Sequence, residues 1–157
     1  MNHLILMCGI PGCGKSTYGR KLVEIHKDWK YISRDEIRFQ YVADQEHYYD
    51  HEYEVYKEFC NRIDMYLMEG KTVIADATHL SKGSRSKLIN NLTVKPNKVT
   101  VIVMVTDFET CLNRVHSREE AITRVPDKTM YSMKHHYRKP DPRFEDWIDE
   151  VVYVKGE

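Results

Sequence analysis

A short stretch near the N-terminus combines glycines, a lysine and hydroxyl side chains: Gly9-Ile10-Pro11-Gly12-Cys13-Gly14-Lys15-Ser16-Thr17. It matches the pattern G-x-x-x-x-G-K-[ST], in which the N–H groups of a glycine-rich turn surround phosphate oxygens. Lys15 can reach the β- and γ-phosphates, and the Ser16 hydroxyl can be a ligand of Mg²⁺. The stretch follows an apolar run and precedes a helical pattern, which is the context that this motif requires. We therefore predict that residues 9–17, the phosphate loop, bind ATP or another nucleoside triphosphate. The alternative, a glycine-rich turn that contains Lys-Ser by chance, does not explain this context.

Asp35 and Arg38 have the types and spacing of groups that could act on a phosphate acceptor. An aspartate beside a bound hydroxyl can take its proton, and an arginine on the same helical face can hold an anionic group. The alternative is an aspartate that only stabilises the start of a helix, next to a solvated arginine. The spacing alone leaves both interpretations open. The transferase interpretation requires the Asp35 side chain to face the mouth of the phosphate loop.

Asp76 ends a buried apolar run and could reach Mg²⁺ through water or contact the acceptor. The alternative is a carboxylate that caps the turn at Ala77-Thr78. Farther along the chain, three arginines surround an irregular stretch at 118–125: Arg114, Arg118 and Arg124. A mobile segment with arginines can cover a γ-phosphate and exclude water, although an exposed charged loop would have the same composition.

The residues that could do chemistry lie between alternating strands and helices. Strands are predicted at 3–8, 29–32, 72–76, 99–105 and 151–154. Helices are predicted from the phosphate loop to Ile25 and at 34–40, 46–68, 82–91, 108–117 and 126–137, with Ser33 and Ser81 as N-caps. This alternation predicts one α/β domain over 1–157, a P-loop NTPase-type parallel sheet of about five strands with helices on both faces. Because ligands bind at the carboxyl ends of such strands, we expect 9–17, 33–35 and 76–79 on one rim.

Composition restricts the class of protein. The 157 residues carry 24 lysines and arginines and 24 aspartates and glutamates, which gives no support to an extended nucleic-acid surface. No apolar run is long enough to span a membrane, and the N-terminal run leads directly into the phosphate loop, unlike a signal peptide. The four cysteines show no C-x-x-C pair, which favours reduced thiols in a cytoplasmic enzyme. The oligomeric state has no signature in the sequence.

Three further patterns have simple structural interpretations. A stripe at helical spacing predicts packing in the core and groove, not a platform for stacking bases: Tyr49, Tyr53, Tyr56, Cys60, Ile63 and Leu67. Lys82, Arg85 and Lys87 are expected to form a solvated helix face. The pairs His47/His51 and His135/His136 have no third ligand nearby and are expected to face solvent.

Together these stretches resemble a known family. The segments 9–17, 33–38 and 76–78, with Arg114-x-x-x-Arg118 before Val125-Pro126, are similar to the kinase domain of phage-type 5′-hydroxyl polynucleotide kinases, among the zeta-toxin-like and gluconate-kinase-like P-loop phosphotransferases. The resemblance covers nearly the whole chain. It implies the following site residues: Lys15 and Ser16 for triphosphate and Mg²⁺, Asp35 as general base, Arg38 on the acceptor phosphate, Asp76 and Thr78 beside the acceptor, and Arg118 on the donor phosphates with Arg114 or Arg124 nearby.

The resemblance implies Mg²⁺-dependent transfer of the γ-phosphate to the 5′-hydroxyl end of DNA or RNA. With no phosphatase or ligase segment in the sequence, a role in nucleic acid repair would be limited to the kinase step. One alternative is a kinase for a small-molecule hydroxyl, such as a nucleoside, sugar or antibiotic, which the neutral net charge favours mildly. Another is an ATPase or nucleotide-binding switch that transfers nothing.

Overall fold

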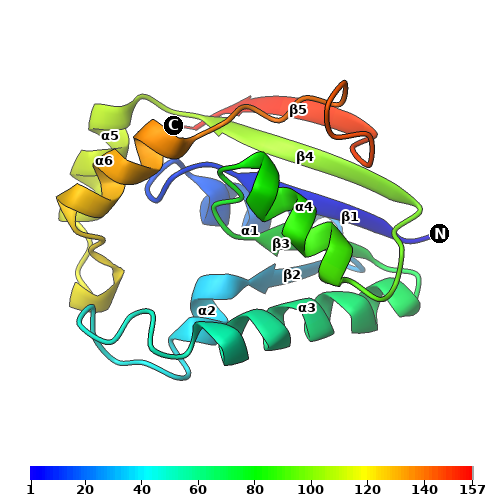
Figure 1. The fold of residues 1–157 in the computed structure, drawn as a ribbon, viewed down its shortest axis with the longest axis horizontal. Coiled ribbons are helices and arrows are strands. Elements are labelled where there is room, and N and C mark those ends of the chain that lie inside the picture. The colour runs from blue at the N-terminus through cyan, green and yellow to red at the C-terminus, as the bar shows by residue number, and fades with distance from the viewer. Residues whose placement is uncertain (157) are drawn as a thin grey trace.

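The computed structural model describes residues 1–156, in which parallel strands form one sheet in the order β2-β3-β1-β4-β5 (Figure 1). The strands are β1 (His3–Cys8), β2 (Lys30–Ser33), β3 (Thr72–Asp76), β4 (Lys98–Val105) and β5 (Glu150–Lys155). Parallel neighbours cannot be joined by tight hairpins, so helices connect them. These are α1 (Lys15–Ile25), α2 (Arg34–Arg38), α3 (Glu52–Met68), α4 (Lys82–Asn91), α5 (Phe108–His116), a 3₁₀ turn η1 (Ala121–Thr123) and α6 (Asp127–His136). The predicted fold class is confirmed.

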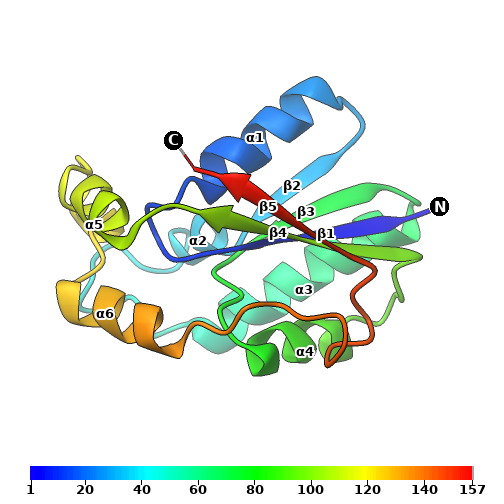
Figure 2. The same cartoon turned by 90° about the horizontal axis from the view of Figure 1, so that it is seen from above.

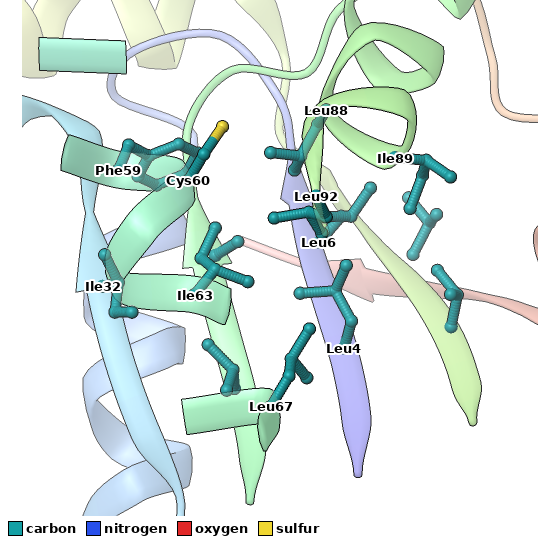
Figure 3. Close-up of a cluster of buried hydrophobic side chains, with 14 of the residues drawn as sticks. Leu4, Leu6, Ile32, Phe59, Cys60, Ile63, Leu67, Leu88, Ile89 and Leu92 are labelled. Carbon is teal, nitrogen blue, oxygen red and sulfur yellow. The ribbon is translucent and has the colours of Figure 1, made fainter. Parts of the chain in front are cut away.

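Helices cover both faces of the sheet (Figure 2). Alternate residues of β1 therefore enter two different cores: Leu4 and Leu6 pack with α3 and α4, whereas Ile5 and Met7 pack on the face covered by α1. Figure 3 shows Ile63, Leu67 and Leu88 gathered around Leu4 and Leu6 in the first core. α5 and α6 lie beyond the carboxyl ends of the strands (Figures 1 and 2), where they flank the predicted rim.

The strand register brings the predicted segments together at this rim. Met7 and Ser33, each near the end of its strand, are both paired with Asp76 at the end of β3. β1 then leads into the phosphate loop, and β2 leads into α2 through its N-cap Ser33, whose hydroxyl accepts a hydrogen bond from the Glu36 N–H at 3.2 Å. The expected N-caps at Ser33 and Ser81 are both present.

The long helix differs from its prediction at the N-terminal end. α3 begins at Glu52 instead of Glu46, and the preceding segment forms turns in which Asp44 accepts a hydrogen bond from the His47 N–H at 2.9 Å. Such side-chain bonds to the backbone compete with helix formation. Cys60, Ile63 and Leu67 are buried as expected, but Tyr49 and Tyr53 are exposed. Val55 and Phe59 take the core positions and the half-buried Tyr56 packs against them, so the core prediction was wrong for Tyr49 and Tyr53 but not for Tyr56.

Arg85 corrects a second expectation. Its side chain is completely buried, and its Nε and Nη2 donate to Glu145 Oε1 and Oε2 at 2.8 and 3.1 Å. Its Nη1 donates to the His79 carbonyl at 2.8 Å. The face of α4 that carries Arg85 also carries Leu88 and Ile89 and turns inward, whereas Lys82 and Lys87 are exposed as predicted. A carboxylate 60 residues away therefore neutralises this arginine inside the protein.

The cysteines and most of the paired histidines lie where the sequence predicts. All four cysteines are free and buried, and His47, His135 and His136 are exposed. Among residues 1–156, no helix has the length and apolar character needed to cross a membrane.

Candidate active site

A cleft of about 840 Å³ opens at the carboxyl ends of the strands. The phosphate loop, the start of α2, the end of β3 and the segment after α5 all contribute to its walls. Every predicted site residue lines it except Gly9, Cys13 and Arg124. Gly9 and Cys13 instead support the loop from behind, since the Gly9 N–H donates to the Thr78 carbonyl at 3.0 Å and Cys13 is buried in the core.

The phosphate loop depends on glycine at two positions. Gly12 and Gly14 have φ angles of 83° and 100°, which residues with a Cβ rarely adopt. A Cβ on Gly12 would also lie 2.5 Å from the Cys111 carbonyl oxygen. Gly14 is the N-cap of α1 and provides no side-chain hydrogen bond to the first turn. The unpaired N–H groups and positive dipole end of α1 therefore remain available to an anion.

Lys15 is nearly buried within this loop. Its Nζ donates to the Ile10 carbonyl at 3.1 Å and lies 3.8 Å from the Cys13 sulfur. The ammonium group thus lies within the phosphate loop, against Ile10 and Cys13. This arrangement can bind the oxygens of a polyphosphate with a fixed positive charge.

Ser16 and Asp76 meet at the mouth of the loop. The Ser16 hydroxyl donates to Asp76 Oδ2 at 2.8 Å, and the Tyr31 hydroxyl donates to the same oxygen. Burial, followed by the charge of Asp76, raises the pKa of Tyr31 above its usual value, so this hydroxyl keeps its proton. A Cβ on Gly19 of α1 would lie 2.8 Å from the Tyr31 ring, which shows why a glycine is needed in this helix. Sequence reasoning missed Tyr31.

A hydroxyl and a carboxylate beside a phosphate cradle fit a Mg²⁺ ion that completes its coordination with phosphate oxygens and water. Ser16 and Asp76 are such a pair. In the part of the chain that the structure describes, no group of three or more histidine, cysteine, aspartate or glutamate side chains could hold a metal by itself.

Asp35 lines the same cleft as the phosphate loop, and the orientation of its side chain toward the mouth of the loop stays a prediction. Its side chain is 56% exposed. Its Oδ1 accepts hydrogen bonds from the Tyr48 hydroxyl, at 2.9 Å, and from Arg38 Nη1. Within residues 1–156 the hydrogen bonds to this carboxylate all reach Oδ1, which leaves Oδ2 for another partner.

Arg38 is buried and has several partners already. Its Nε and Nη2 donate to the two carboxylate oxygens of Glu52 at 2.8 and 2.7 Å, and its guanidinium lies 4.5 Å from the Tyr48 ring centroid. Burial alone would lower the pKa of Arg38, but Glu52, Tyr48 and Asp35 raise it above the usual value, so the cation persists. Arg34 Nη2 also donates to Glu52 at 3.0 Å. Sequence reasoning missed Tyr48 and Glu52, which lie 10 and 14 residues beyond Arg38.

The three predicted arginines around the stretch at 118–125 have different surroundings. Arg114 and Arg118 line the cleft, where Arg114 Nη1 donates to the Gly12 carbonyl at 3.1 Å and Arg118 Nη1 to the Thr123 carbonyl at 2.7 Å. Arg124 is exposed outside the cleft and donates to the carbonyls of residues 118 and 119. The structure therefore brings two of the three arginines to the cleft, and one of these, Arg114, to the phosphate loop itself.

His79 is a buried residue that sequence reasoning did not select. It has a φ of 46°, and its Nδ1 lies 2.7 Å from the Met7 carbonyl oxygen, to which it must donate. Burial, the largest influence, lowers the pKa of His79 to about 4, so the ring is neutral at physiological pH. The ring therefore ties the turn after β3 to β1 behind the phosphate loop.

Comparisons with known proteins agree with this fold. Residues 4–140 match the protein-family model described as an AAA domain. A fungal RNA kinase superposes with a TM-score of 0.71 at 16% identity, covering 99% of this chain and 75% of that chain. A gluconokinase from Sinorhizobium meliloti gives 0.64 at 18% identity, covering 98% and 82%. Kti12 from Chaetomium thermophilum, bound to ADP-AlF3, gives 0.69 at 19% identity, covering 97% and 88%. No curated protein sequence matches the chain.

Proposed function

Because the chain belongs to the AAA-domain family that it matches over residues 4–140, we propose that it is a P-loop kinase that transfers the γ-phosphate of ATP or another nucleoside triphosphate to the 5′-hydroxyl end of DNA or RNA. One observation carries the proposal. The phosphate loop and a carboxylate with a free oxygen, Asp35, line the same cleft. A nucleotide-binding switch would not need a second carboxylate held in this way.

The donor side of the cleft holds the triphosphate. The N–H groups of the phosphate loop and Lys15 bind the phosphate oxygens, and Arg114 and Arg118 add positive charge above them. A bound Mg²⁺ would be held by Ser16 and by Asp76, directly or through water, and would neutralise charge on the β- and γ-phosphates.

Asp35 is the general base in this proposal. As the acceptor oxygen bonds to the γ-phosphorus, its proton passes to Asp35 Oδ2, and the bond from that phosphorus to the β–γ bridging oxygen breaks. The products are a phosphorylated acceptor and a nucleoside diphosphate. Tyr48 and Arg38 hold Oδ1, so they fix the direction in which Oδ2 points.

The choice of a nucleic-acid acceptor rests on two arginines beside Asp35. Arg34 and Arg38 line the acceptor side of the cleft, and both already pair with Glu52, so a 3′-phosphate of a 5′-terminal nucleotide would share them with that carboxylate. The fold of a fungal RNA kinase covers nearly all of this chain. A second candidate is a small-molecule kinase, because a gluconokinase shares the fold and the net charge is zero. All four cysteines are free thiols, which is typical of a protein in a reducing cytoplasm and is compatible with either kind of kinase.

The test is transfer from γ-labelled ATP to a panel of acceptors. Single-stranded DNA and RNA with a 5′-hydroxyl are compared with the same oligonucleotides carrying a 5′-phosphate and with nucleosides and sugars. We expect label only on the 5′-hydroxyl oligonucleotides, and none with the Lys15→Ala variant, which lacks the phosphate-binding cation. Label on small molecules alone would contradict the nucleic-acid acceptor. ATP hydrolysis without any transfer would contradict the kinase.

A further inference from the structure

Tyr49 occupies an unusual place for a large aromatic residue. It is 57% exposed, although its neighbour Tyr48 is 7% exposed. It also lines the cleft, on the side that holds Asp35 and Arg38. An aromatic ring that faces an open, polar cleft has apolar surface available to a ligand.

The Tyr49 ring is held in place from behind. It packs against the Tyr48 ring with centroids 4.9 Å apart and planes at 78°, and the Arg38 guanidinium lies 5.7 Å from its centroid. Both contacts come from groups that are buried, so the ring loses little freedom when a ligand covers its exposed part. Tyr49 is therefore a preformed surface for a flat, apolar group.

Its position relative to Asp35 indicates what that group is. Tyr48 links the two residues, since its hydroxyl contacts Asp35 and its ring contacts Tyr49. Tyr49 therefore lies one tyrosine ring beyond the contact with Asp35, so a ligand whose hydroxyl meets Asp35 would reach Tyr49 with a group farther from that hydroxyl. In a 5′-terminal nucleoside the ribose follows the hydroxyl and the base lies beyond the ribose. The base has a flat π-face, whereas a sugar acid or a free sugar has none.

We propose that the base of the acceptor's 5′-terminal nucleotide stacks on Tyr49, and that the site selects acceptors with a base at this position. This inference rests on the proposed 5′-hydroxyl kinase function. It names the part of the acceptor that the cleft recognises besides the hydroxyl and the phosphate. Recognition by stacking accepts any base, because every base has a π-face.

The test compares two acceptors that differ only in the 5′-terminal base: a 5′-hydroxyl oligonucleotide and the same oligonucleotide with an abasic 5′-nucleotide. We expect removal of the base to lower kcat/KM of the wild-type enzyme about tenfold or more, from the usual strength of base–aromatic stacking. The Tyr49→Leu variant should show a similar loss with the normal acceptor and no further loss with the abasic one. The KM for ATP should not change, because Tyr49 belongs to the acceptor side.

Two controls make the result specific. Tyr49→Phe keeps the ring and should preserve the difference between the two acceptors. Tyr53→Leu removes a tyrosine that is 77% exposed but does not line the cleft, so it should behave like wild type. Equal use of both acceptors by the wild-type enzyme would overturn stacking on Tyr49 and leave the kinase function intact. Failure to phosphorylate any 5′-hydroxyl oligonucleotide would overturn the acceptor class itself.

Discussion

The hydroxyl of Tyr48 donates a 2.9 Å hydrogen bond to Oδ1 of Asp35, so a buried residue orients a carboxylate that is 56% exposed. Burial and the charge of Asp35 raise the pKa of Tyr48 above its usual value, which keeps the hydroxyl protonated as a donor. Arg38 in turn donates to the Tyr48 oxygen at 3.1 Å and to Glu52. The proposed base is therefore positioned from the protein interior.

Replacement of Tyr48 by phenylalanine tests this positioning. The variant keeps the ring but removes the donor to Asp35, and hydrogen bonds to charged groups contribute about 1.5–3 kcal/mol. We expect kcat to fall about tenfold or more while the KM for ATP stays constant. The measurement is steady-state transfer to a 5′-hydroxyl oligonucleotide. Tyr41→Phe is the matched control, because Tyr41 lies in the same segment outside the cleft. An unchanged kcat would show that Tyr48 does not position the base.

The variant Asp35→Asn removes the proposed proton acceptor with little change of shape. Loss of a general base typically lowers a rate by about a hundredfold to ten-thousandfold. We expect a fall of this size in kcat with an unchanged KM for ATP, because the phosphate loop is untouched. Glu36→Gln, at the adjacent exposed residue that pairs with Arg20, is the control and should retain wild-type kcat. Near-normal turnover in Asp35→Asn would eliminate this carboxylate as the base.

The features that could be predicted from the sequence depend on neighbouring residues. The phosphate loop, the N-caps Ser33 and Ser81 and the strand end at Asp76 all have signatures within a few residues. The parallel register then brings distant segments to one rim without further information. For this reason most of the predicted site residues line the cleft.

The features that could not be predicted depend on partners far along the chain. Arg85 has the same local pattern as Lys82 and Lys87, and only the position of Glu145 makes it a core residue. Tyr31 and Asp76 meet because β2 and β3 are adjacent. Likewise, Tyr49 shares the helical spacing of core residues, but α3 begins after it, at Glu52. Spacing alone cannot locate the start of a helix when turns compete for the same residues.

The buried pair of Arg85 and Glu145 gives a prediction about stability. Removal of one partner leaves the other charge buried and unpaired, which typically costs about 3–5 kcal/mol. We expect both Arg85→Met and Glu145→Leu to lower the free energy of unfolding by about this amount in urea titrations. The double variant should lose less than the sum of the two, because neither charge remains. Lys82→Met, on the exposed side of α4, should be nearly neutral. Additive losses in the double variant would contradict a direct pair.

His79 predicts how stability depends on pH. Its pKa is lowered by burial from 6.5 to about 4, so the folded protein prefers the neutral ring. Stability from this group is therefore complete above pH 6.5 and is lost as pH falls toward 4, with a total of about 3 kcal/mol.

His79→Asn keeps a side-chain donor, tolerates the positive φ and removes the titration. We expect the free energy of unfolding of wild type to fall between pH 7 and pH 5 by clearly more than that of His79→Asn. His135→Asn, at an exposed position, should retain the wild-type slope. Equal slopes in wild type and His79→Asn would show that this imidazole does not resist protonation in the folded state.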